Sequence, residues 1–142
     1  MNMKILLLIG LLIIGGSALA MAPVASDVVV IVNKGNDNQV YRSFVVKVYT
    51  GEAKTWSNGG TITALDLPED SPVRVSFTSR VLGKSVSSMK SLWTEYVFSG
   101  KATPPKQLGS DEEVKKMVGS NKNAIGYIRA SSLDDTVKAV IK

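Results

Sequence analysis

The sequence predicts a three-layer α/β domain, in which helices cover both faces of a β-sheet. First, β-branched segments alternate with segments of helical spacing along the chain. Second, Val28–Val32 is an uninterrupted apolar run, which is typical of a strand in a sheet that is covered on both faces. Third, helix-start signals stand at Ser71-Pro72 and at Ser110, between the strand segments.

The first half of the domain is expected to run strand, helix, strand. The turn residues Asn33–Asn36 close the strand Val28–Val32. Val40–Tyr49 is rich in β-branched residues, but its apolar positions recur at helical spacing and a glycine follows at position 51, so we predict a helix. After a loop that carries Trp56, which is expected to be the more open of the two tryptophans, the alternating segment Thr61–Leu67 is predicted to be a strand.

Two consecutive helices are expected next. Ser71 is the predicted N-cap and Pro72 the first residue of a helix that ends at Gly83. The segment from Val86 to Gly100 is predicted to be the second helix, because its apolar residues recur at helical spacing. Two of its aromatic residues, Trp93 and Tyr96, are expected to belong to the core.

The remaining part of the chain is expected to run loop, helix, strand, strand. Lys101–Gly109 contains two adjacent prolines and is predicted to be a loop. Ser110 and Glu113 have the spacing of a capping box and predict the start of a helix. Ala124–Arg129 and Thr136–Ile141 are predicted to be strands.

The first twenty residues have the layout of a secretory signal peptide. Lys4 provides a positive start, Ile5–Ile14 is an apolar run, and small residues lead to a cleavage site after Ala20. As a helix the apolar run spans about 15 Å, less than the roughly 30 Å that a retained membrane anchor needs. We therefore expect cleavage after Ala20, with Val24–Ser26 as the alternative site.

Cleavage would leave residues 21–26 as a flexible mature N-terminus and residues 27–142 as one domain. The protein is then expected to be periplasmic or secreted. It contains no cysteine, so it carries no lipid anchor of the cysteine type and no thiolate nucleophile. It also contains no histidine, which removes the usual catalytic triads and zinc sites. We expect neither an enzyme nor a cofactor.

The charge of the chain is modestly positive, with 17 Lys and Arg against 12 Asp and Glu. The basic residues are dispersed, Lys115-Lys116 being the only adjacent pair, and no nucleic-acid motif organises them. No nucleic acid is therefore expected as a partner. A positive field of this size suits a small anionic solute or an anionic envelope surface, although an ordinary solvated surface has the same composition.

The turn into the helix at Ser71 is the best candidate anion site. Its hydroxyl and the free N–H groups of a first helical turn can receive an oxyanion, and Arg74 is placed to reach back to it. Ordinary helix capping predicts the same residues. The carboxylates of Asp66, Glu69 and Asp70 would suit a hard cation or, less readily, a glycosidase pair, but their spacing is not that of an EF-hand calcium loop.

Five segments then occur in a familiar order: Val28–Asn33, Val48–Trp56, Pro68–Phe77, Val97–Gly100 and Asn123–Ile128. Together they resemble the phosphate-type solute-binding proteins of ABC importers, in the type II periplasmic-binding-protein superfamily. The chain is most similar to the short exported proteins described as phosphate ABC transporter substrate-binding proteins. The resemblance implies a single three-layer lobe of that fold, with a mixed sheet and helices on both faces, and a role in the uptake of phosphate or another small oxyanion.

The resemblance also assigns binding residues. In the phosphate binders the anion turn reads R-x-D-G-S-G-T, and Ser71 matches its serine. Pro72 and Val73 stand where the motif has glycine and threonine, and the arginine at the strand end is missing. The expected ligand-binding residues are therefore Ser71, Val73 and Arg74, with Arg74 replacing the missing arginine.

The expected partners follow from the same resemblance. They are a small oxyanion such as phosphate, an ABC permease or an envelope protein, and a second copy of the chain that would rebuild a two-lobed cleft. The alternative is a periplasmic interaction module that retains only the fold of this superfamily and binds no ligand.

Overall fold

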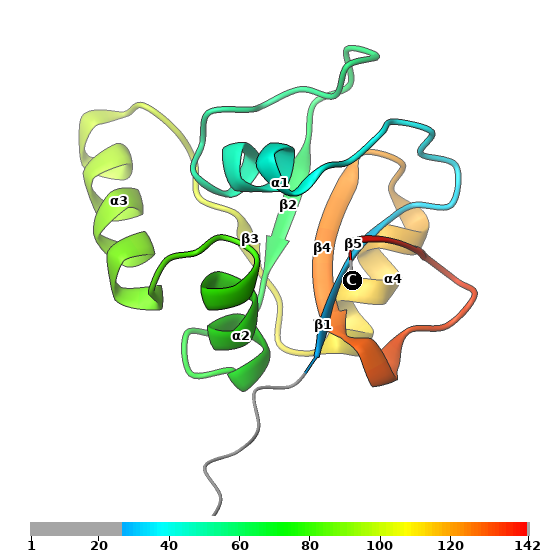
Figure 1. The fold of residues 1–142 in the computed structure, drawn as a ribbon. Coiled ribbons are helices and arrows are strands. Elements are labelled where there is room, and N and C mark those ends of the chain that lie inside the picture. Colours follow the sequence, from blue (N-terminus) through cyan, green and yellow to red (C-terminus); the bar gives the residue numbers. More distant parts are fainter. Residues whose placement is uncertain (1–26, 142) are drawn as a thin grey trace, which may run out of the picture.

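The computed structural model describes residues 27–141, whose strands form a five-stranded sheet with the order β3-β2-β4-β1-β5 (Figure 1). The strands are β1 (Val28–Val32), β2 (Thr63–Asp66), β3 (Lys106–Gln107), β4 (Ala124–Arg129) and β5 (Lys138–Ile141). Strand β2 is parallel to β3 and β4, whereas β1 is antiparallel to β4 and β5. The sheet is therefore mixed, as predicted.

Helices cover both faces of this sheet. They are α1 (Arg42–Tyr49), α2 (Pro72–Arg80), α3 (Val86–Ser99) and α4 (Asp111–Ser120), and a short 3₁₀ helix, η1 (Ala130–Ser132), follows β4. On one face, the ring of Tyr127 in β4 contacts Tyr49 of α1 and stacks on Phe77 of α2. On the other face, a Cβ atom at Gly126 would lie 2.6 Å from Val114 of α4, so this helix packs directly against the sheet. The predicted three-layer α/β fold is confirmed.

The core is built from the central strands and the inward faces of three helices. Val30, Ile31 and Val32 of β1 are fully buried, as expected of a strand with cover on both sides. The rings of Phe77 and Tyr127 stack with their centroids 3.8 Å apart, which joins α2 firmly to the centre of the sheet.

Two local predictions are wrong. Part of the predicted loop Lys101–Gly109 is the short edge strand β3, which pairs with β2 and is extended by a hydrogen bond from Leu108 N to Asp66 O of 2.8 Å. Trp56 is not the more open tryptophan: only 2% of it is exposed, and its Nε1 donates to the carbonyl of Asn123 at 3.0 Å. In both cases the local structure is determined by a partner that is distant in the sequence, β2 for the edge strand and Asn123 for the tryptophan.

Helix α3 is less buried than its apolar spacing predicts. Of its fourteen residues only Met89 is buried. Trp93 is half-buried and packs against the core, whereas Tyr96 is half-buried at its margin. Phe98, near the end of the helix, is 94% exposed. In Figure 1 the helix stands at one side of the molecule, beyond β3.

The predicted signal peptide, residues 1–20, and the predicted flexible segment, residues 21–26, lie outside the described residues. Between residues 27 and 141, no helix combines the length and the apolar character that crossing a membrane requires.

Candidate functional site

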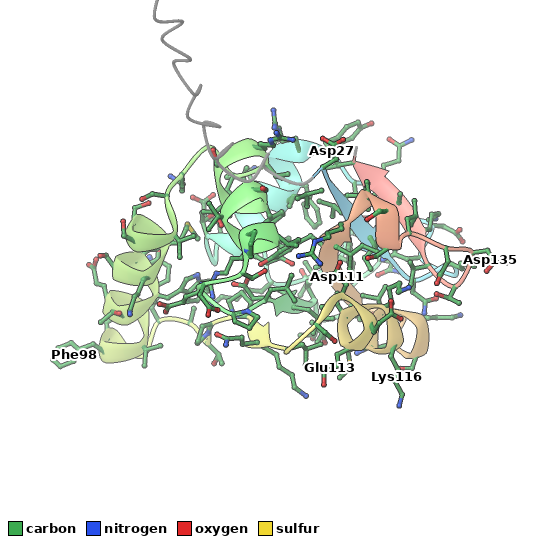
Figure 2. All side chains as sticks on the ribbon, turned by 90° about the horizontal axis from the view of Figure 1, so that it is seen from below. Asp27, Phe98, Asp111, Glu113, Lys116 and Asp135 are labelled. Atoms are coloured by element: carbon green, nitrogen blue, oxygen red, sulfur yellow. The ribbon has the colours of Figure 1, made fainter. Side chains whose placement is uncertain are left out.

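The carboxyl ends of the parallel strands β2, β3 and β4 lie together at one edge of the sheet. The N-termini of α2 and α4 begin just beyond this edge and enclose, with the end of β4, a hollow of about 510 Å³. We call it the α2–α4 hollow. Figure 2 is turned to view the molecule from below, with Asp111 of the hollow near the centre. Ligands of open α/β sheets bind in this kind of position, where strands end and helices start.

Ser71 and Val73 both line the α2–α4 hollow. Ser71 is the N-cap of α2, and its Oγ accepts a hydrogen bond from the backbone N of Arg74 at 3.4 Å. Val73 belongs to the first turn, where backbone N–H groups have no carbonyl partner within the helix. The serine hydroxyl and the valine amide are therefore placed side by side at the positive end of the helix dipole.

The side chain of Arg74 is directed elsewhere. Its Nη1 donates to the carbonyl of Leu67 at 2.9 Å, and its Nε lies 3.5 Å from Oδ1 of Asp66. Only 11% of the arginine side chain is exposed. It lines a separate hollow beneath α3, not the one that Ser71 and Val73 line. The structure thus separates the guanidinium group from the other two predicted site residues.

Arg74 belongs to a buried polar cluster under α2. The carboxylate of Asp66 accepts hydrogen bonds from the backbone N of Leu67, at 2.9 Å, and from the hydroxyl of Tyr127. Burial raises the pKa of Asp66 above its ordinary value, although Tyr127 and Arg74 act in the opposite direction. Burial also raises the pKa of Tyr127, so its hydroxyl stays protonated and can donate. Each polar group in this cluster has a partner inside the protein, which makes its role structural.

The three carboxylates that suggested a cation site lie apart. Asp66 is in the buried cluster, Glu69 pairs with Lys90 at 3.2 Å, and Asp70 lines the α2–α4 hollow. No group of three potential metal ligands is formed within residues 27–141.

The second wall of the hollow is the start of α4. Ser110 Oγ accepts from the backbone N of Glu113 at 3.2 Å, which is one half of the predicted capping box. The other half differs, because the carboxylate of Glu113 accepts from the backbone N of Gly109, at 2.6 Å, and not from the N-cap. Asp111 Oδ2 accepts from the backbone N of Arg129, at 3.1 Å, and from Ser132 Oγ, at 3.0 Å. These bonds join α4 to the end of β4.

Charges of both signs line the α2–α4 hollow. The exposed residue Arg129 lines it together with Asp70, Asp111 and Glu112, and the carboxylate of Glu112 forms an ion pair with Lys115 at 2.9 Å. Sequence reasoning did not identify Ser110 or Arg129 as site residues. The pairing of β2 with β4 brings them to Ser71, and the signal that would have revealed them is the common direction of the strands that precede each helix.

Comparisons with known proteins give a match of fold. No family model matches the sequence, and no curated protein matches it. A solved structure of an ABC-type phosphate transport receptor from Vibrio cholerae is 22% identical, with a TM-score of 0.63 over 81% of this chain and 45% of that one. A putative phosphate ABC transporter substrate-binding protein with bound phosphate, from Clostridium perfringens, is 22% identical, with a TM-score of 0.66 over 81% of this chain and 44% of that one.

A third structure, PstS from Borrelia burgdorferi, is 12% identical, with a TM-score of 0.58 over 82% of this chain and 47% of that one. The chain spans less than half the length of each of these proteins. At these identities the likeness concerns the fold, and it agrees with the resemblance in the sequence. The chain therefore has the fold of one lobe of the phosphate-type ABC substrate-binding proteins, as predicted.

Proposed function

We propose that the protein is an exported, non-enzymatic solute-binding lobe that binds phosphate or another small oxyanion in the α2–α4 hollow and serves its uptake by an ABC transporter. The observation that carries this proposal is the meeting of two helix N-termini at the carboxyl edge of parallel strands, around a hollow of about 510 Å³. Free amide N–H groups and helix dipoles favour an anion at such a position. The fold match to a protein with bound phosphate supports the oxyanion class.

The proposed ligands differ in one respect from those expected from the sequence. Ser71 provides its hydroxyl and Val73 its backbone amide, as expected. We assign the charge that Arg74 was expected to provide to Arg129, an exposed residue that lines the hollow. Arg74 keeps an indirect role, because its backbone N–H holds the Ser71 hydroxyl in place.

Affinity is expected to be weak. The hollow is open, and the carboxylates of Asp70 and Asp111 oppose an anion, whereas Arg129 is the one basic residue among the described residues that line it. The charge of Glu112 is offset by its pair with Lys115. We expect a dissociation constant for phosphate near or above about 100 μM. A second lobe, from another copy of the chain, would enclose the ligand further.

Calorimetric titration of the exported protein with inorganic phosphate, at low and high salt, tests the proposal. Asp70→Asn removes a carboxylate that is exposed at the hollow, and we expect it to tighten binding by about threefold, which is typical of one exposed charge interaction. The matched control is Asp135→Asn, because Asp135 is exposed far from the hollow (Figure 2) and should leave the affinity unchanged. If neither the wild type nor Asp70→Asn releases heat with millimolar phosphate, the binding proposal fails while the fold remains.

The observations on Arg74 favour a second candidate function, a ligand-free interaction module. Its guanidinium bonds to Leu67 and Asp66 within the protein, and acidic residues outnumber basic ones in the lining of the α2–α4 hollow. The hollow therefore has little of the positive charge that an anion needs, although the fold is retained. Such a module would dock on an envelope protein or on a second copy. Phosphate titration combined with sedimentation separates these cases. Phosphate affinity supports the first proposal, and its absence supports the second, in which a dimer indicates docking on a second copy and a monomer indicates another partner protein.

A further inference from the structure

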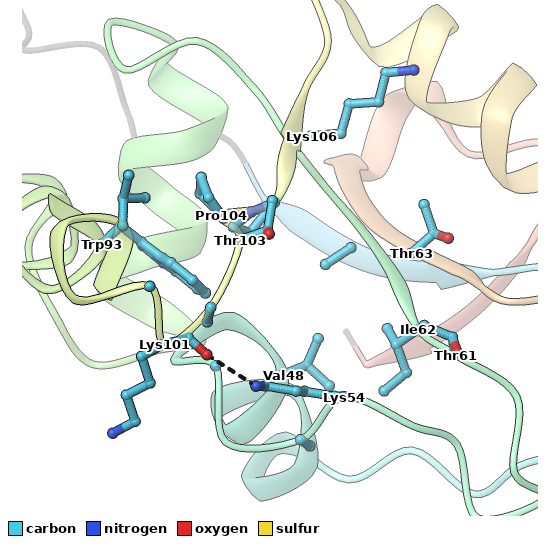
Figure 3. A pocket seen from close by; sticks show the side chains of 17 residues that line it. Val48, Lys54, Thr61, Ile62, Thr63, Trp93, Lys101, Thr103, Pro104 and Lys106 are labelled. Carbon is cyan, nitrogen blue, oxygen red and sulfur yellow. Dashed lines mark hydrogen bonds between the residues drawn. The ribbon is translucent and has the colours of Figure 1, made fainter. Parts of the chain in front are cut away.

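A second concave surface lies between α1 and α3. It is a groove of about 740 Å³, and Figure 3 shows its walls: the end of α1, the start of β2, the last turns of α3 and the segment that leads from α3 to β3. We call it the α1–α3 groove. It shares no lining residue with the α2–α4 hollow, so the two surfaces are independent. Its size is within the range of small-molecule binding sites.

The charge of this groove has one sign. Lys54, Lys101 and Lys106 line it, and no carboxylate is among its lining residues. The Nζ of Lys54 reaches across to the backbone carbonyl of Lys101 at 3.2 Å, while the other two lysines extend from its rim (Figure 3). The ion pairs found within residues 27–141 all involve other cations. Among the described residues, no carboxylate pairs with any of the three lysines, although the ammonium of Lys101 lies over the ring of Tyr96, 4.5 Å from its centroid. The net positive charge around this concave surface attracts anions.

The same groove has a rigid apolar wall. Trp93 lines it, and its indole is held by a hydrogen bond from Nε1 to the carbonyl of Tyr49 at 3.1 Å and by an edge-on contact with Tyr96. Gly51, with φ +80°, packs closely behind the indole: a Cβ atom at this position would lie only 3.1 Å from Trp93 Cη2. Val97 lines the groove as well and is 56% exposed. A ligand with an apolar body would cover this surface without any rearrangement of the indole.

We propose that the α1–α3 groove binds an amphipathic organic anion, with its apolar body against Trp93 and Val97 and its phosphate, sulfonate or carboxylate group near Lys54. The apolar wall gives affinity through burial, and the lysines select for negative charge. Inorganic phosphate has the negative charge that the groove attracts, but it has no apolar part to cover the wall. The ligand class therefore differs from that of the α2–α4 hollow, and either site can fail without the other.

The protein contains an internal reporter for this binding. It has two tryptophans, and each indole N–H is bonded to a different carbonyl: that of Trp93 to Tyr49, at the groove, and that of Trp56 to Asn123, in the core. We expect a titration of the ¹⁵N-labelled exported protein with 1-naphthyl phosphate to shift the Trp93 Nε1–H resonance saturably and to leave that of Trp56 in place. Inorganic phosphate and 1-naphthol should each bind at least fivefold more weakly, roughly the effect of one lost surface interaction.

Charge-reversal variants test the role of the lysines. Lys54→Glu and Lys106→Glu change exposed side chains and should each weaken the binding of 1-naphthyl phosphate by about fivefold, which corresponds to one exposed charge pair. The matched control is Lys116→Glu, an equal change of net charge on the exposed side of α4, which should alter the affinity by less than about twofold (Figure 2).

Any of four outcomes would overturn the proposal. Both indole resonances would move alike, or neither would move. 1-Naphthol would bind as tightly as 1-naphthyl phosphate, so that charge would not select the ligand. Lys116→Glu would weaken binding as much as Lys54→Glu, so that net charge and not the groove would be responsible.

Discussion

Helices α2 and α3 follow each other in the chain and both begin at a serine N-cap, but their side chains are used in opposite ways. The nine residues of α2 include four that are buried, and Phe77 among them stacks on the central strand. The fourteen residues of α3 include one that is buried, Met89, and its last turn exposes Val97 and Phe98.

This difference explains why the two helices would contribute different groups to a binding site. Side chains of α2 are used to hold the fold, so the helix offers a ligand its first turn: the Ser71 hydroxyl and the backbone amide of Val73. Helix α3 contributes little to the core, and its side chains form the walls of a groove. The proposed oxyanion site in the α2–α4 hollow thus depends on backbone geometry, and the proposed site in the α1–α3 groove depends on side-chain chemistry.

The largest expected effect comes from a pair of phenylalanine substitutions. Phe77 is 1% exposed and Phe98 is 94% exposed. Phe77→Ala should lower the free energy of unfolding by about 4 kcal/mol, because it removes a stacked ring and leaves a cavity. Phe98→Ala should change it by less than about 0.5 kcal/mol. Urea denaturation of both variants measures the contrast, and comparable losses would show that α3 is as much a part of the core as α2.

A pair of arginine substitutions should give the next largest effect. Arg74→Met breaks a pair with Asp66 in which both side chains are largely buried, and should cost about 3 kcal/mol of stability. Arg80→Met breaks the exposed pair with Asp27 and should cost less than about 1 kcal/mol. Phosphate titration of folded Arg74→Met should match the wild type within about twofold. A loss of phosphate binding in a stable Arg74→Met protein would show that this side chain contributes to binding after all.

The two serine caps should behave alike. Ser71 Oγ accepts from the N–H three residues on at 3.4 Å, and Ser85 Oγ does so at 3.1 Å. Ser71→Ala and Ser85→Ala should each lower stability by about 1 kcal/mol in thermal or urea unfolding. Phosphate affinity should fall only in Ser71→Ala. An equal fall in both variants would assign the effect to stability and not to a ligand contact.

The smallest expected effect is a pH dependence beneath α2. Burial raises the folded-state pKa of Asp66 above its ordinary value of 3.8. Above pH 3.8 the folded protein therefore holds this proton more firmly than the unfolded chain, and the contribution of Asp66 to stability falls as pH rises through its folded pKa. Urea unfolding across this range should show that the stability of the wild type, relative to Asp66→Asn, declines with increasing pH. A difference that stays constant or increases would contradict the buried position of this carboxyl group.

Local signals in the sequence predicted the parts of the fold that are determined locally. Ser71 and Pro72 start α2 where expected. Gly51, which was predicted to follow a helix end, adopts a left-handed conformation with φ +80° just after α1 ends. Strand β1 has the predicted bounds, because its β-branched apolar run is bounded by turn residues and suits a strand that is covered on both faces.

The features that sequence reasoning missed depend on distant partners. Strand β3 consists of two polar residues whose pairing is decided by β2. The direction of the Arg74 side chain is decided by Asp66 and Leu67, which the fold places beneath it. Arg129 reaches the candidate site only because β4 is parallel to β2. Residue type and spacing contain none of this information, so Ser71 and Val73 could be predicted together and Arg129 could not.

The central claim, that the α2–α4 hollow receives an oxyanion, is tested most directly by titrating inorganic phosphate into the ¹⁵N-labelled protein and following backbone amide resonances. The account predicts saturable shifts at Val73 of α2 and Asp111 of α4, whose amides lie in the first turns that face the hollow. Amides that stay in place at both first turns, with phosphate raised to millimolar concentration, would contradict it.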